Sequence, residues 1–266
     1  MKNLFKFIFF LISCFFLKKK RFIILNPNLN LFGIKKILIY DKKNKSFFTH
    51  IIRNNFDLIT IEEIFFYESY KIDHLKIYKE ILDNFESKKK LIIDCGSNIG
   101  CSTNYFLRTF KNSKVISIEP DKDNFLLLSE NVKNQNAILI NNAISNENFN
   151  FEIKDSEDNR AKNIVKVDKE NLKKTLTINQ ILDEKENEEF FPFLIKIDIE
   201  GHEKDLFKSN IEWFDKFQIV IIEIHDWMLP GESISKGYLN SIVNSMKENK
   251  RDTIISGENL ISIKTK

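Results

Sequence analysis

The 266-residue sequence has few cysteines, few glycines and almost no net charge. Its three cysteines form no CxxC pair and suggest no disulfide partners, which favours a reducing compartment. The 41 basic and 38 acidic residues leave a net charge of +3, so nothing in the composition demands a nucleic-acid partner. Glycine occurs only seven times, which we attribute to compositional bias. With 42% hydrophobic and 30% charged residues, the chain suits one globular domain with an extension.

Long hydrophobic runs are also missing, apart from one at the N-terminus. Leu4 to Leu17 is apolar except for Lys6 and Ser13, and as a helix it would span about 21 Å, short of the roughly 30 Å hydrocarbon core of a bilayer. The basic cluster Lys18 to Arg21 stands where a signal peptide would be cleaved, which argues against a signal peptide. We expect residues 1–21 to contact a membrane face, with the basic cluster on anionic head groups. Packing against the domain is the alternative.

Residues 22–90 are predicted to form a small accessory region. The apolar runs Ile34–Tyr40 and Phe47–Ile52 flank a polar stretch, as the two strands of a hairpin do. The pattern Thr60-Ile61-Glu62-Glu63 has the form of a capping box and predicts a helix that begins there. A second helix is expected over Asp73–Phe85, before the main fold begins.

The stretch LIIDCGSNIG, Leu91 to Gly100, predicts a buried strand, a tight turn and the start of a helix over residues 100–111. Gly96 and Gly100 let the turn adopt backbone angles that a Cβ would forbid, and they let a ligand lie against the backbone. The N-terminus of the next helix favours a carboxylate or a phosphate. We therefore expect a ligand site at this turn.

Two absences from this turn limit the choice of ligand. Asn98 and Cys101 occupy the positions where a dinucleotide motif has its second and third glycines, so a pyrophosphate is disfavoured. The turn also contains no lysine, which a P-loop would need. An adenosine-type ligand with a zwitterionic tail remains, and it suits the acid Asp94 at the end of the strand. S-adenosylmethionine has such a tail.

Polar side chains follow the next two predicted strands. The run VISIEPD ends its apolar part at Glu119, where the two hydroxyls of a nucleoside ribose would lie. Taken alone, Glu119 could equally be an acid that the dipole of the following helix favours. The strand Ala137–Ile140 leads to Asn142, which could offer its amide to an adenine edge or merely terminate the strand. Residues 146–174 are polar and are expected to form an extra hairpin or a mobile insertion.

Two further strands end in ionisable side chains. The segment FLIKIDIEGHE places Asp198, Glu200 and His202 at the carboxyl edge of the sheet, where open α/β sheets bind ligands. The segment QIVIIEIHD adds Glu223, His225 and Asp226. An attacking hydroxyl must lose its proton, and the unperturbed pKa of histidine suits that task near neutral pH. We expect His225 to be the base and His202 to be the second candidate.

Two other interpretations of this cluster stay open. Asp198, Glu200 and His225, with Asp226 as a fourth candidate, could hold a divalent cation that acidifies the hydroxyl. The carboxylates could equally cap helices and accept hydrogen bonds. From the sequence we therefore assign no metal ligand.

Several segments, taken in order, resemble the FkbM family of S-adenosylmethionine-dependent methyltransferases. The resemblance runs from about Ile92 to His225 and rests on IIDCGSNIG, ISIEPD, NNAIS, LTINQILDE, LIKIDIEGHE and IIEIH. It implies an α/β class I methyltransferase (Rossmann-like) fold, a mostly parallel seven-stranded sheet with helices on both faces. One strand would be antiparallel, and Thr253–Ile255 and Leu260–Ile263 would supply the closing pair. The implied reaction is O-methylation, commonly of sugar hydroxyls in bacterial surface glycans or of natural-product scaffolds.

The resemblance also implies roles for single residues. The cofactor contacts that follow from the matched motifs are Asp94, Gly96, Asn98, Gly100, Glu119, Asn142, Ala143 and Asp198. The catalytic candidates at the strand tips are His225, Asp198, Glu200 and His202, of which Asp198 and Glu200 match the family motif and the histidines rest on the residue pattern alone. Lys196 and Gly201 match the same KIDIEG motif without an assigned role.

These inferences divide the chain into an N-terminal segment (1–21), an accessory region (22–90) and a methyltransferase domain (91–266). We expect S-adenosyl-L-methionine as the cofactor and a small-molecule or glycan acceptor, with a sugar hydroxyl of a glycan or glycolipid as the methylated group. The expected location is the cytoplasm or the inner face of the membrane. The alternatives are a cofactor-binding scaffold without activity and an NAD-dependent oxidoreductase, which the missing glycines oppose.

Overall fold

The computed structural model describes residues 20–25, 36–73, 76–133, 135–154, 160, 162–169, 172–228, 230–248 and 250–265. The predictions for residues 1–19 and for the start of the hairpin at Ile34 lie outside these residues. Among the residues described, we find no helix with the length and apolarity that crossing a bilayer requires.

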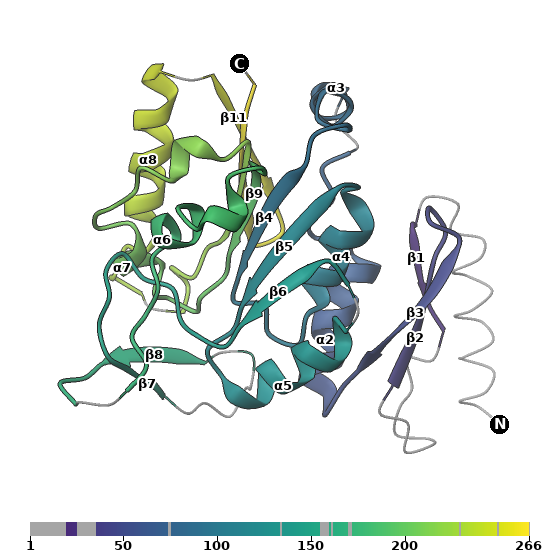
Figure 1. Ribbon diagram of the computed structural model, residues 1–266, viewed down its shortest axis with the longest axis horizontal. Helices are drawn as coiled ribbons and strands as arrows, with labels where there is room; N and C mark the ends of the chain where they lie inside the picture. Colours follow the sequence, from purple (N-terminus) through teal and green to yellow (C-terminus); the bar gives the residue numbers. More distant parts are fainter. Residues whose placement is uncertain are drawn as a thin grey trace.

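The centre of the fold is a seven-stranded sheet with the strand order β11-β12-β10-β9-β4-β5-β6 (Figure 1). Neighbouring strands run parallel from β10 to β6, and β12 runs antiparallel to both of its neighbours. The predicted α/β class I fold is confirmed, with its single antiparallel strand and its closing pair. The strands are β4 (Lys90–Cys95), β5 (Ser113–Ile118), β6 (Ala137–Ile140), β9 (Phe191–Ile197), β10 (Ile219–Glu223), β11 (Arg251–Ser256) and β12 (Asn259–Lys264).

Helices cover both faces of this sheet (Figure 1). They are α4 (Cys101–Thr109) and α5 (Lys122–Asn131) on one face, and α6 (Ile178–Leu182), α7 (Glu203–Leu206) and α8 (Ser235–Glu248) on the other, with the short helices η3 (Lys185–Asn187) and η4 (Phe214–Lys216). Alternate side chains of a strand point to opposite faces. Ile92 of β4 therefore packs in one core with Phe106, and Ile93 packs in a second core with Leu206 and Tyr238. All six residues of β4 are buried, as expected of a strand covered on both faces.

A three-stranded antiparallel sheet precedes the central sheet, in the order β1-β2-β3. Its strands are β1 (Phe22–Ile24), β2 (Lys36–Asp41) and β3 (Ser46–Ile51). The strands β2 and β3 form the predicted hairpin, whereas β1 was not predicted. The ring centroid of Phe22 lies 5.0 Å from that of Phe65 and 5.8 Å from that of Tyr105 in α4. The accessory sheet therefore shares a hydrophobic core with the central fold.

Lys20 and Arg21, at the start of the described chain, form hydrogen bonds and an ion pair with residues of this region. The Nζ atom of Lys20 donates a 2.6 Å hydrogen bond to the carbonyl of Phe66. The guanidinium of Arg21 pairs with Asp41 at 2.9 Å and donates to Thr109 Oγ1 at 2.8 Å. Acceptors within the protein therefore hold the last two residues of the cluster Lys18 to Arg21, and the expected contact of residues 1–21 with membrane head groups stays a prediction.

The helix after β3 begins earlier than predicted. Asn54 caps α2 (Asn55–Ile61) by accepting hydrogen bonds from the backbone N–H groups of Phe56 and Asp57. The chain continues as the π-helix η2 (Glu62–Phe66). The predicted start at Thr60 is therefore wrong, because Asn54 already satisfies the free N–H groups upstream.

Two shorter predictions are confirmed. The helix α3 (Lys76–Asn84) lies within the predicted Asp73–Phe85. Within the polar stretch 146–174, the strands β7 (Phe151–Lys154) and β8 (Asn163–Lys166) pair antiparallel as an extra hairpin. Figure 1 shows this hairpin beyond the carboxyl ends of the central strands.

Candidate functional site

A cavity of about 650 Å³ opens at the carboxyl edge of the parallel strands. Its walls come from the turn after β4, the loops after β5, β6, β9 and β10, and the segment from α2 to Tyr70. The β7–β8 hairpin and the turn between β11 and β12 also contribute. Every predicted site residue lines this cavity except Asp94 and Gly100; those that do are Gly96, Asn98, Glu119, Asn142, Ala143, Asp198, Glu200, His202 and His225.

Gly96 and Gly100 each allow a different close contact of the turn. Gly96 has a φ of +80°, and a Cβ on it would lie 1.7 Å from the carbonyl oxygen of Asp198. Gly100 has a φ of +90°, and a Cβ on it would lie 2.8 Å from Cγ2 of Val132 at the end of α5. Gly96 therefore lets the turn lie against the end of β9 at the cavity, whereas Gly100 lets α5 pack against the start of α4.

Asp94 lies behind the cavity wall. It is fully buried, and its Oδ2 atom accepts hydrogen bonds from Ser102 Oγ and Thr103 Oγ1, both at 2.7 Å. Its Oδ1 atom lies 3.5 Å from Nζ of Lys196. In this structure Asp94 fastens the first turn of α4 to β4, and so supports the glycine turn from below.

Glu119 follows β5 and faces the cavity. Its carboxylate accepts hydrogen bonds from the backbone N–H groups of Asn98 at 2.8 Å and Asp121 at 3.0 Å. Burial raises the pKa of Glu119 to about 7, although the N–H groups of Asp121 and Asn98 oppose the shift. Each carboxylate oxygen has two lone pairs, so the hydrogen bonds within the chain leave capacity for hydroxyl donors of a ligand.

The loop after β6 carries the predicted pair Asn142 and Ala143. The side-chain oxygen of Asn142 accepts a 2.8 Å hydrogen bond from the backbone N–H of Ala143. The neighbouring Asn141, which the sequence analysis did not single out, donates to the carbonyls of Glu119 and Pro120 at 2.9 and 3.0 Å. Asn141 thus ties the loop after β6 to the loop after β5.

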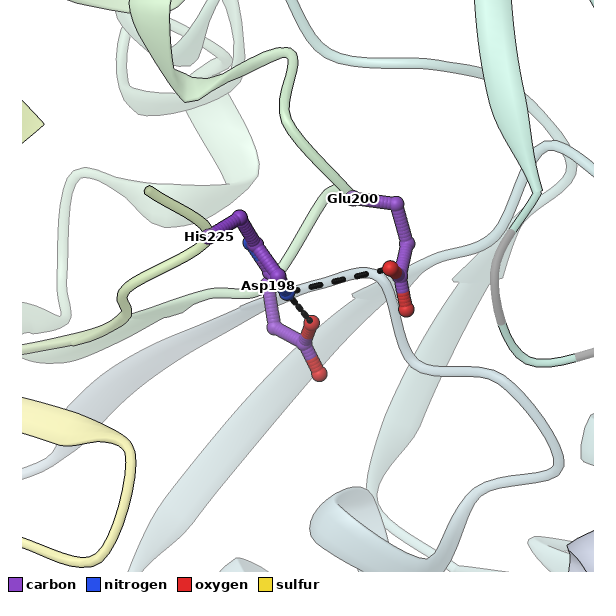
Figure 2. Close-up of side chains that lie close together, drawn as sticks. All are labelled: Asp198, Glu200 and His225. Atoms are coloured by element: carbon purple, nitrogen blue, oxygen red, sulfur yellow. Dashed lines mark ion pairs between the residues drawn. The ribbon is translucent and has the colours of Figure 1, made fainter. Parts of the chain in front are cut away.

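His225 stands among four carboxylates, two of which are drawn with it in Figure 2. Its Nδ1 atom lies 3.0 Å from Oε1 of Glu203. Its Nε2 atom lies 3.7 Å from Glu200, 3.7 Å from Glu223 and 3.8 Å from Asp198. The loops after β9 and β10 therefore bring Asp198, Glu200 and His225 together, as the sequence predicted.

The carboxylates change the proton affinities within this cluster. Burial lowers the pKa of His225, but the hydrogen bond and charge of Glu203, with the charges of Asp198 and Glu200, more than offset it and raise the pKa to about 10. Burial and the charge of Asp198 raise the pKa of Glu200 to about 8. The charge of Asp198 and burial raise the pKa of Glu223 to about 9. His225 therefore holds a proton at neutral pH, unlike the unperturbed histidine that the sequence analysis assumed.

Two buried residues of the site received no role from the sequence. Lys196, 2% exposed, donates a 2.7 Å hydrogen bond to the carbonyl of Gly96 and pairs with Asp198 at 3.0 Å. Glu203, 1% exposed, contacts His225 and also accepts a hydrogen bond from the backbone N–H of Ile199. The sequence did contain a signal for Lys196, because it is the one charged residue of an otherwise apolar strand. Buried lysines are nearly always paired with an acid, so a partner could have been expected.

The two remaining strand-tip candidates have other partners. His202 lines the cavity, but its Nε2 atom lies 3.0 Å from Ser145 Oγ and its Nδ1 atom lies 3.3 Å from Asp205. Burial lowers the pKa of His202. Asp226 accepts a hydrogen bond from the backbone N–H of Ser235 at the start of α8. Neither belongs to the group of possible metal ligands, which consists of Asp198, Glu200 and His225.

Comparison with protein families decides the class of this chain. The model of the methyltransferase FkbM domain matches residues 94–249, which is more than half of the sequence. The chain belongs to the FkbM methyltransferase family. It is therefore a methyltransferase, and its cofactor is S-adenosylmethionine rather than the NAD of the alternative interpretation. A comparison with curated proteins gave no match.

Solved structures similar to this FkbM protein include an O-methyltransferase from Bacillus cereus in complex with SAH (13% identity, 71% of this chain and 80% of that chain, TM-score 0.40). Others are a methyltransferase from Geobacter sulfurreducens (11% identity, 80% and 90%, TM-score 0.37) and the N-terminal domain of human METTL16 in complex with SAH (14% identity, 70% and 67%, TM-score 0.37). These identities and scores carry no information about the substrate of this chain.

Proposed function

We propose that this FkbM methyltransferase transfers a methyl group from S-adenosylmethionine to a hydroxyl of a sugar in a glycan or glycolipid. The proposal rests on a single cavity that holds the two sets of groups such a reaction needs. One set, Gly96, Asn98 and Glu119, suits a nucleoside with a zwitterionic tail. The other, His225 with its flanking carboxylates, suits removal of a proton from a hydroxyl.

The cofactor would lie across the ends of β4, β5 and β6. Its methionine end rests on the turn from Gly96 to Asn98, where a ligand can approach the backbone closely. Its ribose hydroxyls donate hydrogen bonds to Glu119, and its adenine lies against Asn142 and Ala143. Asp198 links the two halves of the site, because its carbonyl lies against Gly96 and its carboxylate lies beside His225.

The reaction breaks the bond between the sulfonium sulfur and the methyl carbon, and the electron pair stays on sulfur. A carbon–oxygen bond forms to the acceptor, whose hydroxyl proton leaves to the cluster. Because His225 already holds a proton, we assign proton acceptance to a carboxylate, Glu200 or Glu223. Their pKa values are raised to about 8 and about 9 in the free protein, so they accept the proton only when they are ionised. The positive charge of the bound sulfonium favours their ionised forms.

The mouth of the cavity supports a sugar as the acceptor. Tyr67 and Trp227 line the cavity and are 66% and 64% exposed. An aromatic ring with a polar tip suits a sugar, which has an apolar C–H face and hydroxyls at its edge. Thr60 and Glu63 add polar groups to the same wall. No such exposed aromatic residues would be needed to bind the cofactor alone.

The first test is a calorimetric titration with S-adenosylhomocysteine, with NAD as the comparison. Binding in the micromolar range, about −8 kcal/mol, is expected for the former and none for the latter. Transfer is then measured with methyl-labelled S-adenosylmethionine and lipid-linked or free glycans. The expected product is a labelled methyl ether on a sugar, which resists the mild alkali that would release a methyl ester. Cofactor binding without transfer to any glycan would favour the inactive scaffold or a different acceptor.

A further inference from the structure

The strand-tip cluster contains a set of side chains with the geometry of a cation site. Asp198 and Glu200 follow β9, His225 follows the neighbouring β10, and one ligand atom from each lies within 4.8 Å of the others. Figure 2 shows the imidazole pointing toward both carboxylates. Asp198 and Glu200 stand one and three residues after β9, and His225 stands two residues after β10, so all three lie near the ends of adjacent parallel strands.

One ligand atom of this set is buried without the hydrogen bond that a buried polar atom normally makes. Asp198 Oδ1 is shielded from solvent and accepts no hydrogen bond from any residue that the structure describes. His225 is 1% exposed, and its Nε2 atom approaches the carboxylate oxygens of Asp198 and Glu200 only to 3.8 and 3.7 Å. Such distances are too long for hydrogen bonds. Neighbouring ligand atoms of an octahedral ion, bound at about 2.1 Å, lie roughly 3.0 Å apart. The gap is therefore wide enough for the ion, and the side chains would close on it by less than about 1 Å.

Glu203 holds the imidazole in the orientation of a metal ligand. Its Oε1 atom lies 3.0 Å from Nδ1 of His225 and is itself fixed by the backbone N–H of Ile199 at 2.9 Å. A histidine that binds a metal usually donates its other ring N–H to a carboxylate in this way. The contact places the Nδ1 proton toward Glu203, and a bound cation would replace the second proton of the imidazole, on Nε2.

The donor set selects the class of cation. Two carboxylates and one imidazole, with no thiolate among them, suit hard or intermediate divalent ions rather than soft ones. We propose that Asp198, Glu200 and His225 bind a divalent cation of the Mg²⁺ or Mn²⁺ class in the acceptor half of the cavity.

The role of this cation rests on the proposed function, whereas its binding does not. The cation would bind the acceptor hydroxyl and lower its pKa, so that its proton is lost to water. The oxygen then attacks the methyl carbon, and the bond from that carbon to sulfur breaks to leave S-adenosylhomocysteine. In this scheme His225 positions the cation.

The experiment is a Mn²⁺ titration, followed by electron paramagnetic resonance, of full-length protein loaded with S-adenosylhomocysteine and freed of metal with a chelator. One saturable Mn²⁺ site is expected, and Mg²⁺ should displace the ion. Glu200→Gln and His225→Asn should each weaken Mn²⁺ binding by at least about tenfold. Glu189→Gln is the matched control, because Glu189 pairs with Lys89 on the surface at the opposite end of β9; its Mn²⁺ affinity should equal that of the wild type. Calorimetry with S-adenosylhomocysteine shows in each variant that the cofactor site is folded.

The outcomes separate this inference from the proposed function. Absence of saturable Mn²⁺ binding, or equal binding in Glu200→Gln and the wild type, overturns the cation site even if methyl transfer proceeds. Transfer that stops on chelation and returns with Mg²⁺ or Mn²⁺ supports both the site and its role. Saturable Mn²⁺ binding without transfer to any glycan upholds the site and removes the acceptor assignment.

Discussion

The Nζ atom of Lys196 donates a 2.7 Å hydrogen bond to the carbonyl oxygen of Gly96 and so joins the middle of the site to the glycine turn. The same ammonium lies 3.0 Å from Asp198 and 3.5 Å from Asp94. Burial lowers the pKa of Lys196, but the charges of Asp198, Tyr70 and Asp94 more than offset it, so the pKa lies well above its usual value. A permanently charged lysine therefore neutralises two acids and fixes the turn on which the cofactor is proposed to lie.

Lys196→Met should destabilise the protein, because it leaves the fully buried Asp94 and its neighbour Asp198 without their counter-charge. Removal of one partner from a buried ion pair costs about 3–5 kcal/mol, and we expect a loss of this size in urea unfolding together with weaker binding of S-adenosylhomocysteine. Lys89→Met is the matched control, since Lys89 and Glu189 form a pair that is 58% and 59% exposed. Its cost should stay below about 1 kcal/mol. Equal losses in the two variants would contradict the role given to Lys196.

Gly96→Ala should abolish cofactor binding because the new Cβ would lie 1.7 Å from the carbonyl oxygen of Asp198, so that the turn or the end of β9 must move. Gly231→Ala provides the comparison. Its φ of +88° is close to the +80° of Gly96, but a Cβ there meets no atom within 4 Å among the described residues. The backbone strain of about 1–2 kcal/mol is therefore common to both variants, and only Gly96→Ala adds the clash. Calorimetry with S-adenosylhomocysteine measures the difference; retained affinity in Gly96→Ala would show that the turn can rearrange.

The affinity for S-adenosylhomocysteine should depend on pH through Glu119. The pKa of this group in the free protein is raised to about 7, and ribose hydroxyls that donate to the carboxylate stabilise its ionised form. Affinity should therefore be complete above pH 7 and decline as the pH falls through about 7. The stability of the free protein depends on pH in the opposite direction. The contribution of Glu119 to the free energy of unfolding is fully present below the usual pKa of 4.5 and is lost as the pH rises through about 7.

Glu119→Gln isolates this dependence, because the amide keeps the size of the side chain and cannot titrate. We expect weaker binding of S-adenosylhomocysteine and an affinity that no longer varies with pH in this range. Calorimetric titrations at a series of pH values would test both expectations. A variant with the affinity and pH profile of the wild type would remove Glu119 from the ribose site.

His225→Ala should leave binding of S-adenosylhomocysteine intact and lower methyl transfer by at least about a hundredfold, the usual size of an acid–base or positioning contribution. The corresponding His202→Ala change should cost less activity. The reason is that both ring nitrogens of His202 already face groups of the protein, Ser145 at 3.0 Å and Asp205 at 3.3 Å. The ratio of the two turnover numbers is the measurement, and a larger loss in His202→Ala would reverse the assignment of the two histidines.

The site could be located from the sequence because its ionisable residues stand directly after the apolar strands that define the fold. The strand Ala137–Ile140 was predicted with the bounds that the structure shows, since polar residues flank its apolar run on both sides. The acids at the ends of such strands necessarily meet at one edge of a parallel sheet, which is why Glu119, Asp198 and His225 could be placed in one cavity.

The failures arose where tertiary contacts decide the outcome. The three-residue strand β1 forms only because it pairs with β2, and no local sequence pattern predicts it. The start of α2 depended on which of two nearby residues, Asn54 or Thr60, caps the helix. The pKa of His225 could not be foreseen, because the groups that raise it, Glu203, Asp198 and Glu200, come from the segment after β9 and not from its own segment.

We propose that residues 1–19 associate the protein with a membrane, on the strength of the apolar run from Leu4 to Leu17. Deletion of residues 1–19 should move the protein from the membrane fraction to the supernatant. The Tm should not change, because the shortened protein retains Arg21 and its pair with Asp41. Arg21→Met should do the reverse, leaving partition unchanged and costing about 3 kcal/mol in urea unfolding, since it leaves the fully buried Asp41 unpaired. If the deletion lowers Tm and leaves partition unchanged, the segment packs on the domain and the membrane proposal fails.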